Sequence, residues 1–224
     1  MLKTLFSGAC FLCRGAASGV LCEPCETELP ALAAPLCPSC ALPSPGGARC
    51  GACLAHPPAF DATVAALAYG FPADALILAL KFRGELALAP YLGARLERAL
   101  RSRGASVPSC VVPVPLSRAR LRSRGFNQAA EIARAITARG PLELMLLERE
   151  RDTPSQADLP WAERQRNVRG AFGVARPLAG ATIAVVDDVM TTGATLDEIA
   201  RALKRAGAAR VENWVVARTP APRG

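Results

Sequence analysis

The stretch Ile183-Ala-Val-Val-Asp-Asp-Val-Met-Thr-Thr-Gly-Ala-Thr195 joins an apolar run to two carboxylates and a glycine-containing turn. The four apolar residues at its start predict a buried strand. Leu196, Ile199 and Leu203 then recur at helical spacing, so we expect a helix directly after the turn. Because open α/β sheets bind ligands beyond the carboxyl ends of their strands, this turn marks the expected binding site.

The turn after the two carboxylates has the features of a phosphate-binding loop. A helix start offers unpaired backbone N–H groups and a partial positive charge. A glycine lets the backbone approach a ligand closely, and threonine hydroxyls add hydrogen-bond donors. We predict that a phosphate group is bound by Thr191, Thr192, Gly193, Ala194 and Thr195.

The adjacent carboxylates, Asp187 and Asp188, are predicted to be the catalytic pair. They can accept hydrogen bonds from the vicinal hydroxyls of a ribose or hold a cation that does so. An acidic helix cap beside an ordinary Thr-Thr-Gly turn is the simpler interpretation. We favour a ribose 5-phosphate site, because the carboxylates, the glycine and the threonines coincide within one short segment.

Strand and helix patterns alternate from about residue 60 onward, which predicts an α/β fold with a parallel sheet. Leu92, Leu96 and Leu100 form the clearest apolar stripe of a helix. Cys110 lies in an apolar stretch and is predicted to be a small buried side chain rather than a reactive thiol. The expected helices are 73–81, 90–103, 127–139 and 195–206, and the expected strands are 61–69, 109–114, 142–147, 182–187 and 211–217.

Eight of the nine cysteines lie in the first 53 residues as four Cys-x-x-Cys pairs. Two such pairs can surround one Zn²⁺ ion with four thiolates, so we predict two structural zinc sites. Disulfides are disfavoured because we expect no export signal, and cytosolic thiols stay reduced. A thioredoxin-like motif is excluded, because prolines and glycines around the pairs break regular structure. The predicted ligands are Cys10, Cys13, Cys22, Cys25, Cys37, Cys40, Cys50 and Cys53.

Neighbouring cysteine pairs most simply share an ion, which puts the first four cysteines in one site and the last four in the other. The interleaved pairing remains open. His56 follows Cys53 closely and could replace a ligand, but eight cysteines already satisfy two ions. Metal binding should supply the folding energy of so short and proline-rich a segment. We expect a module over residues 1–57, followed by a second domain over residues 58–224.

The charge and hydropathy of the chain limit its partners and location. The 224 residues carry a net charge of +8, which favours an anionic partner, either a phosphorylated small molecule or a nucleic acid. No apolar run approaches the ~20 residues that span a bilayer. We therefore expect no membrane span and a cytoplasmic location.

The 183–195 stretch resembles the signature of the type I phosphoribosyltransferases, and nearly the whole chain is similar to the ComF family, which is associated with DNA uptake and competence in bacteria. Directly after the Val-Pro-Leu stretch that ends at Leu116, members of this family often carry His, whereas this chain has Ser117. The resemblance implies a type I phosphoribosyltransferase fold with an N-terminal double zinc ribbon. Besides the cysteine pairs, it rests on Lys81-Phe-Arg-Gly84, Pro113-Val-Pro-Leu116, Arg124-Gly-Phe-Asn-Gln128, Arg151, Thr153, Gln156, Arg166-Asn167 and Gly170-Ala-Phe172.

The resemblance also implies the ligand, phosphoribosyl pyrophosphate (PRPP) bound with Mg²⁺. In the enzymes that the chain resembles, pyrophosphate leaves C1 of the ribose through an oxocarbenium-like transition state. Cations counter the charge of the leaving group. We predict pyrophosphate contacts from Arg118, Arg120, Arg122 and Arg124. A solvated surface or a nucleic-acid patch explains the same arginine run nearly as well.

The polar segment 149–169 holds two prolines and is interpreted as a flap over the site. Trp161 in this segment offers a stacking face for a base, although packing is the more common role of a tryptophan.

Three classes of function fit these features: a transferase that joins ribose 5-phosphate to a base or amine, a sensor that binds PRPP or a nucleotide without turnover, and an accessory protein in DNA uptake that contacts single-stranded DNA or competence proteins. Single-strand binders interleave stacking aromatics with positive charge. Aromatic residues form only 5% of this chain, so we favour PRPP binding over direct DNA binding. No motif identifies the acceptor.

Overall fold

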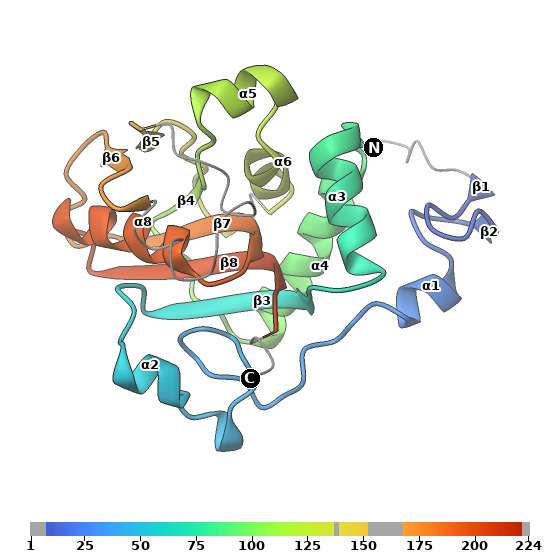
Figure 1. Cartoon of the computed structure of the whole chain (residues 1–224), viewed down its shortest axis with the longest axis horizontal. Coiled ribbons are helices and arrows are strands. Elements are labelled where there is room, and N and C mark those ends of the chain that lie inside the picture. The colour runs from blue at the N-terminus through green and yellow to red at the C-terminus, as the bar shows by residue number, and fades with distance from the viewer. Residues whose placement is uncertain (1–7, 137–138, 152–167, 221–224) are drawn as a thin grey trace.

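The computed structural model describes residues 8–136, 139–151 and 168–220 (Figure 1). Its centre is a four-stranded sheet in the order β3-β8-β7-β4, in which every neighbouring pair is parallel. This confirms the predicted α/β fold. The strands are β3 (Ala62–Ala68), β8 (Arg210–Arg218), β7 (Thr182–Met190) and β4 (Cys110–Pro113).

Helices cover both faces of the sheet, because successive side chains of a strand point to opposite faces. In β7, Ile183 and Val185 pack in the core beneath α8, whereas Ala184 and Val186 pack in the core beneath α3, α4 and α6. The stripe predicted for α4 is confirmed, since all three of its leucines are fully buried. The helices are α3 (Ala73–Arg83), α4 (Leu88–Ser102), α6 (Gln128–Arg134) and α8 (Ala194–Arg205).

The strand predicted over residues 142–147 is wrong. Leu142 makes a single parallel bridge to Val111, and the chain then enters a short strand β5 (Leu147–Arg149) that pairs antiparallel with β6 (Phe172–Val174). The apolar run lacks the alternation of a strand, because Leu146 and Leu147 are both buried. The helix predicted over 127–139 is also shorter, since α6 ends at Arg134.

A helix that the sequence analysis did not expect, α5 (Arg118–Arg124), lies between β4 and α6. The hydroxyl oxygen of Ser117 accepts a hydrogen bond from the backbone N–H of Arg120 at 3.3 Å and caps the helix start. Gly125, in the left-handed conformation at φ 82°, ends it. Asn127 then caps α6 through the backbone N–H groups of Ala129 and Ala130.

The cysteine-rich segment packs on both faces of the sheet. Cys10 and Phe11 belong to the core of α3 and α4, while Cys37, Cys40 and Cys53 belong to the core of α8. In Figure 1, β1 and β2 lie to the right of α3 and α4, and α2 lies below β3. The regular elements of the segment are β1 (Gly8–Ala9), β2 (Ala16–Ala17), α1 (Glu23–Thr27), a 3₁₀ turn (Pro45–Gly47) and α2 (Gly51–Ala55).

Cys110 is buried in β4, as predicted, and burial raises the pKa of its thiol. None of the helices described is long and apolar enough to cross a membrane.

Candidate functional site

The two predicted catalytic carboxylates lie near the carboxyl end of β7. Asp188 is 3% exposed, and its Oδ2 lies 2.7 Å from Nζ of Lys81, which comes from the end of α3. Burial lowers the pKa of Lys81, but the negative charge of Asp188 outweighs this effect and the pKa is raised. Lys81 is therefore a charged partner of Asp188, and the sequence analysis gave it no role.

Asp187 is the less favourably placed of the two carboxylates. Burial and the negative charge of Asp188 raise its pKa well above the ordinary value. A divalent cation shared by the two carboxylates would relieve this repulsion, and carboxylate oxygens are the ligands that Mg²⁺ prefers. The donor chemistry of Asp187 and Asp188 thus fits a Mg²⁺ ion.

The predicted phosphate-binding residues, called here the 191–195 loop, connect β7 to α8. Gly193 adopts φ 83° and ψ 0° and precedes the first turn of the helix. A β-carbon at this position would lie 2.7 Å from Cε of Met190, so both the conformation and the space favour glycine. The hydroxyl oxygen of Thr192 accepts a hydrogen bond from the backbone N–H of Ala194 at 3.1 Å. The loop therefore brings a turn of backbone N–H groups and hydroxyls next to the two carboxylates.

Arg218, at the end of β8, supports the 191–195 loop from below and was missed by the sequence analysis. Its side chain is buried and donates to the backbone carbonyls of Met190 at 3.0 Å and of Thr219 at 2.9 Å. It also donates to the carbonyl of Thr191 and, at 2.8 Å, to that of Cys40. The sequence shows only that an arginine follows the apolar residues of the last strand, and this does not predict which carbonyls it binds.

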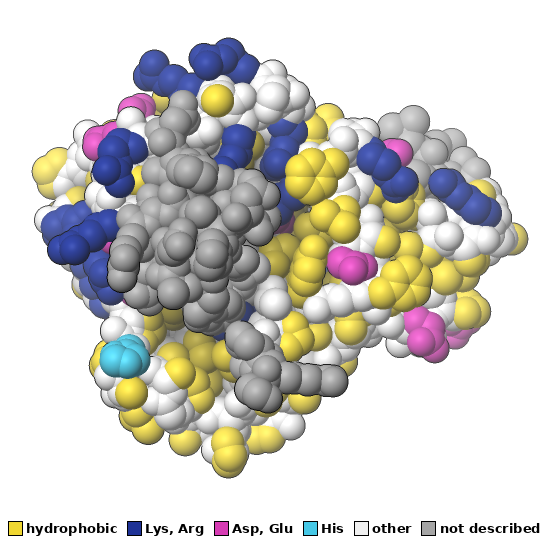
Figure 2. All heavy atoms as spheres, in the orientation of Figure 1, with side chains coloured by type: hydrophobic (Ala, Val, Ile, Leu, Met, Phe, Trp, Pro, Cys, Tyr) yellow, Lys and Arg dark blue, Asp and Glu magenta, His cyan; other side chains and the backbone are white. Residues whose placement is uncertain are grey.

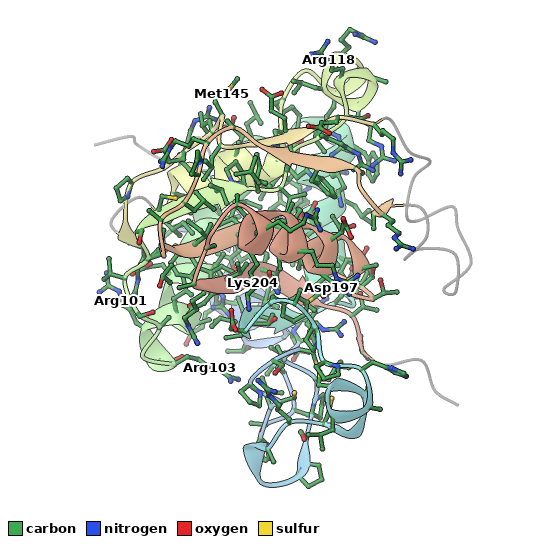
Figure 3. The ribbon with its side chains drawn as sticks, turned by 90° about the vertical axis from the view of Figure 1, so that its left-hand side faces the viewer. Arg101, Arg103, Arg118, Met145, Asp197 and Lys204 are labelled. Atoms are coloured by element: carbon green, nitrogen blue, oxygen red, sulfur yellow. The ribbon has the colours of Figure 1, made fainter. Side chains whose placement is uncertain are left out.

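The four predicted pyrophosphate arginines are divided between two sides of α5. Residues at i and i+4 of a helix share a face, so Arg118 pairs with Arg122 and Arg120 pairs with Arg124. The first pair is exposed, and Figure 3 shows Arg118 projecting away from the sheet. The second pair is half-buried. Burial lowers the pKa of Arg124, and the negative charge of Asp188 opposes this shift, so Asp188 acts electrostatically on Arg124.

Two stretches that carried the family resemblance meet at this site. Residues Lys81 to Gly84 and residues Ser123 to Phe126 line one hollow, and the guanidinium of Arg124 lies 5.2 Å from the ring centroid of Phe82. The side-chain amide of Asn127 donates to the carbonyl of Val114 at 3.0 Å, which fixes this turn to the end of β4.

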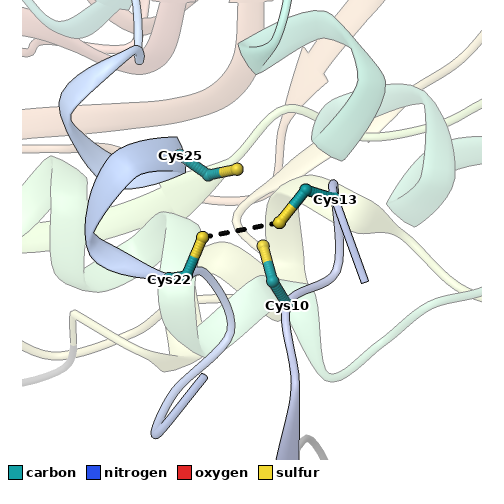
Figure 4. A group of neighbouring side chains, drawn as sticks. All are labelled: Cys10, Cys13, Cys22 and Cys25. Atoms are coloured by element: carbon teal, nitrogen blue, oxygen red, sulfur yellow. Dashed lines mark hydrogen bonds between the residues drawn. The ribbon is translucent and has the colours of Figure 1, made fainter. Parts of the chain in front are cut away.

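The eight cysteines form two clusters of neighbouring pairs, so the interleaved pairing is wrong. The first cluster contains Cys10, Cys13, Cys22 and Cys25, and the second contains Cys37, Cys40, Cys50 and Cys53; within each, all sulfurs lie within 4.8 Å of one another. Figure 4 shows the four sulfurs of the first cluster converging, with Sγ of Cys13 3.5 Å from Sγ of Cys22. His56 is exposed and outside both clusters.

The thiols of the clusters have the chemistry of zinc ligands. Burial tends to raise the pKa of Cys10, but hydrogen bonds from the backbone, first of Cys13 and then of Cys22, lower it to about 6. The same balance lowers the pKa of Cys37 to about 7. In contrast, the neighbouring Cys22 thiol raises the pKa of Cys25, and burial raises the pKa of Cys53. Zinc binds thiolates in closed tetrahedral sites of four cysteines, so both clusters fit structural Zn²⁺.

The two clusters lie against different helices: the first against α3 and α4, and the second against α8. At the first cluster, the guanidinium of Arg83 lies 5.4 Å from the ring centroid of Phe11, and Glu26 accepts from Tyr91 and Arg95 of α4. At the second cluster, the backbone N–H of Ala59, a few residues beyond it, donates to Asp197 of α8 at 2.6 Å. Figure 3 shows Asp197 and Lys204 on the side of α8 that faces this segment.

The central part of the predicted flap lies outside the described residues, and so do Trp161, Thr153, Gln156 and Arg166-Asn167. Directly after the predicted flap, Gly170 donates from its backbone N–H to the buried carboxylate of Glu198 at 3.0 Å.

Two domain models match this chain. A double zinc ribbon domain matches residues 1–54, and a phosphoribosyl transferase domain matches residues 121–224. Together with the parallel sheet and the two cysteine clusters, these matches confirm the predicted type I phosphoribosyltransferase fold with an N-terminal zinc ribbon.

Curated relatives align over nearly the full length. The DNA utilization protein YhgH of Salmonella typhimurium is 36% identical over 222 residues, covering 95% of this chain and 97% of that protein. Competence protein F of Haemophilus influenzae is 30% identical, covering 97% of this chain and all of that protein. A solved purine phosphoribosyltransferase from Pyrococcus horikoshii aligns over 58% of this chain and 73% of that chain, with 17% identity and a TM-score of 0.35.

Proposed function

This chain belongs to the ComF family, and we propose that it binds PRPP with Mg²⁺ at the carboxyl end of β7. The observation that carries this proposal is the direct succession of the Asp187–Asp188 pair, the 191–195 loop and the start of α8. The carboxylates provide acceptors for a diol or ligands for a cation, and the loop provides donors for a phosphate. A ribose 5-phosphate needs both groups close together, because its hydroxyls and its phosphate are carried by the same sugar ring.

The 5-phosphate is assigned to the 191–195 loop. At the start of α8, backbone N–H groups point out of the helix without intrahelical partners, and the helix dipole favours a negative charge there. Gly193 adopts the left-handed turn at φ 83° that leads into the start of α8, a conformation that glycine favours. Arg218 stabilises the loop by binding the carbonyl of Thr191 and that of Met190 just before it, and does not need to contact the ligand.

The ribose hydroxyls are assigned to Asp187 and Asp188. Lys81 fixes the position of Asp188, because its ammonium lies 2.7 Å from the carboxylate. When bound, Mg²⁺ supplies the positive charge that counters the negative charge of the pyrophosphate. Arg124 is the first candidate for a direct pyrophosphate contact, because the charge of Asp188 affects its pKa.

The chemistry proposed for this arrangement is transfer of the ribose 5-phosphate to an acceptor. The bond between C1 and the pyrophosphate oxygen breaks, and pyrophosphate leaves with the electron pair. Positioning and charge stabilisation dominate such reactions, so they require no nucleophile from the protein. We propose that the protein acts in the cytoplasm, where its cysteine clusters stay reduced and hold zinc.

A second candidate is an accessory role in DNA uptake without turnover, with single-stranded DNA or competence proteins as partners. The relatives are named for DNA utilization and competence. Lys and Arg side chains gather over α5 and around β5 and β6 in the face that Figure 2 shows. Affinity for oligothymidylate that falls steeply with salt concentration would support this role.

The test is calorimetric titration of the zinc-loaded protein with PRPP and Mg²⁺. We expect binding by the intact protein and its loss in the double variant Asp187→Asn/Asp188→Asn. The double variant Glu28→Gln/Glu148→Gln is a matched control, because it also removes two carboxylate charges, but at exposed positions. Failure of the intact protein to bind PRPP would overturn the proposal and leave the accessory role.

A further inference from the structure

A hollow of about 390 Å³ opens beside the proposed ribose site. It lies between the end of α3 and the turn that joins α5 to α6. Because Nζ of Lys81 contacts the carboxylate of Asp188, one wall of the hollow adjoins the carboxylate pair directly. Its lining residues are Lys81, Phe82, Arg83, Gly84, Ser123, Arg124 and Phe126.

The hollow offers an aromatic face. Phe82 is 69% exposed in this lining, and ligand pockets are commonly lined by aromatic side chains. Phe126 is half-buried on the opposite stretch of the lining. A planar ring that stacks on Phe82 would cover this exposed surface.

The hollow is also positively charged, and no carboxylate belongs to its lining. Asp188 balances the charge of Lys81. Arg124 donates to the neutral amide oxygen of Gln128 at 2.5 Å, and Arg83 lies over the ring of Phe11, and neither contact balances the charge of a guanidinium group. The lining therefore favours a ligand that carries a negative charge.

We propose that this hollow binds the acceptor of the transfer reaction, and that the acceptor is a planar aromatic ring bearing a carboxylate or phosphate. The inference rests on the proposed PRPP site and extends it to the second substrate. As the C1–O bond breaks and its electron pair leaves with pyrophosphate, a nitrogen in the ring or attached to it forms the C1–N bond with its lone pair. Where that nitrogen carries a proton, the proton is released as the bond forms and pyrophosphate accepts it; a nitrogen without a proton gives a cationic product.

The test is calorimetric titration with orotate, nicotinate and anthranilate as ring anions, adenine as a neutral ring and succinate as an anion without a ring. The protein is first saturated with Mg²⁺ and ribose 5-phosphate, which lacks a leaving group and cannot react. We expect at least one ring anion to bind more tightly than adenine and succinate. Phe82→Ala should weaken that binding by about fivefold or more, whereas Phe82→Tyr should retain it.

Phe71→Ala is the matched control, because Phe71 is 80% exposed and lies beyond the other end of α3. It should leave binding of the ring anion unchanged. Equal affinity of Phe82→Ala and the intact protein, or no binding of any ring anion to a protein that binds PRPP, would overturn the acceptor site alone. Absence of PRPP binding would instead overturn the proposed function, and the acceptor site with it.

Discussion

Arg218 joins the second cysteine cluster to the 191–195 loop through one buried side chain. Its Nε donates to the carbonyl oxygen of Cys40 at 2.8 Å, and its Nη1 donates to the carbonyl oxygen of Met190 at 3.0 Å. The guanidinium is planar and presents its donors in a fixed fork, so it holds both segments in one arrangement. The order of the metal cluster is thereby coupled to the loop that we propose to bind phosphate.

Replacement of this arginine should damage stability and ligand binding together. Arg218→Met leaves several buried carbonyls without donors, and we expect a loss of about 2–4 kcal/mol in the free energy of unfolding. PRPP affinity should fall because the 191–195 loop loses its support. Urea unfolding and calorimetry measure the two effects. Arg176→Met is the control, since this exposed arginine forms a surface ion pair with Glu143 and such pairs contribute ~0–1 kcal/mol. Equal stability of the two variants would contradict the coupling.

Loss of zinc should affect different elements depending on which cluster is disrupted. Cys22→Ser removes a ligand of the first cluster, so amide hydrogen exchange should increase in α3 and α4, which contact that cluster. Cys50→Ser removes a ligand of the second cluster, so exchange should increase around Met190 and at the end of β8. Zinc content of each variant, measured by atomic absorption, should fall by one ion. Identical exchange maps for both variants would show that the clusters act as one unit.

The sequence predicted best those parts whose patterns are local. The run before Asp187 and the stripe on α8 place β7 and α8 correctly, because burial on both faces of a strand and on one face of a helix leaves a periodic trace. The α5 helix has no apolar stripe, so its arginines gave no helical signal. The ion pair of Lys81 with Asp188 and the contacts of Arg218 join distant parts of the chain, and only the fold brings them together.

Asp187→Asn should stabilise the metal-free protein at neutral pH while it abolishes PRPP binding. The unfolded chain ionises Asp187 near pH ~3.9, whereas burial and the charge of Asp188 raise the pKa in the folded state. Below about pH 4 both states hold the proton, so the intact protein has no disadvantage. As the pH rises further, only the unfolded state ionises freely, and the intact protein loses stability relative to the variant.

This pH dependence is measured by urea unfolding of the intact protein and the variant at several values between pH 4.5 and pH 7.5. The difference in unfolding free energy should grow with pH in favour of Asp187→Asn. Addition of Mg²⁺ should stabilise the intact protein and have no effect on the variant. A variant that is less stable than the intact protein throughout this range would show that Asp187 is not strained by its neighbour.

Gly193→Ala should weaken PRPP binding more than its effect on stability explains. An alanine at φ 83° costs roughly 1–2 kcal/mol, and its β-carbon would also displace the side chain of Met190 beneath the loop. Gly180→Ala is a matched control, because Gly180 has φ 79° and open space around it, in a turn before β7. Both variants should lose stability in urea unfolding, Gly193→Ala the more because of the contact with Met190, but only Gly193→Ala should lose PRPP affinity in calorimetry. Equal PRPP affinity in the two variants would mean that the conformation of the loop at Gly193 does not affect phosphate binding.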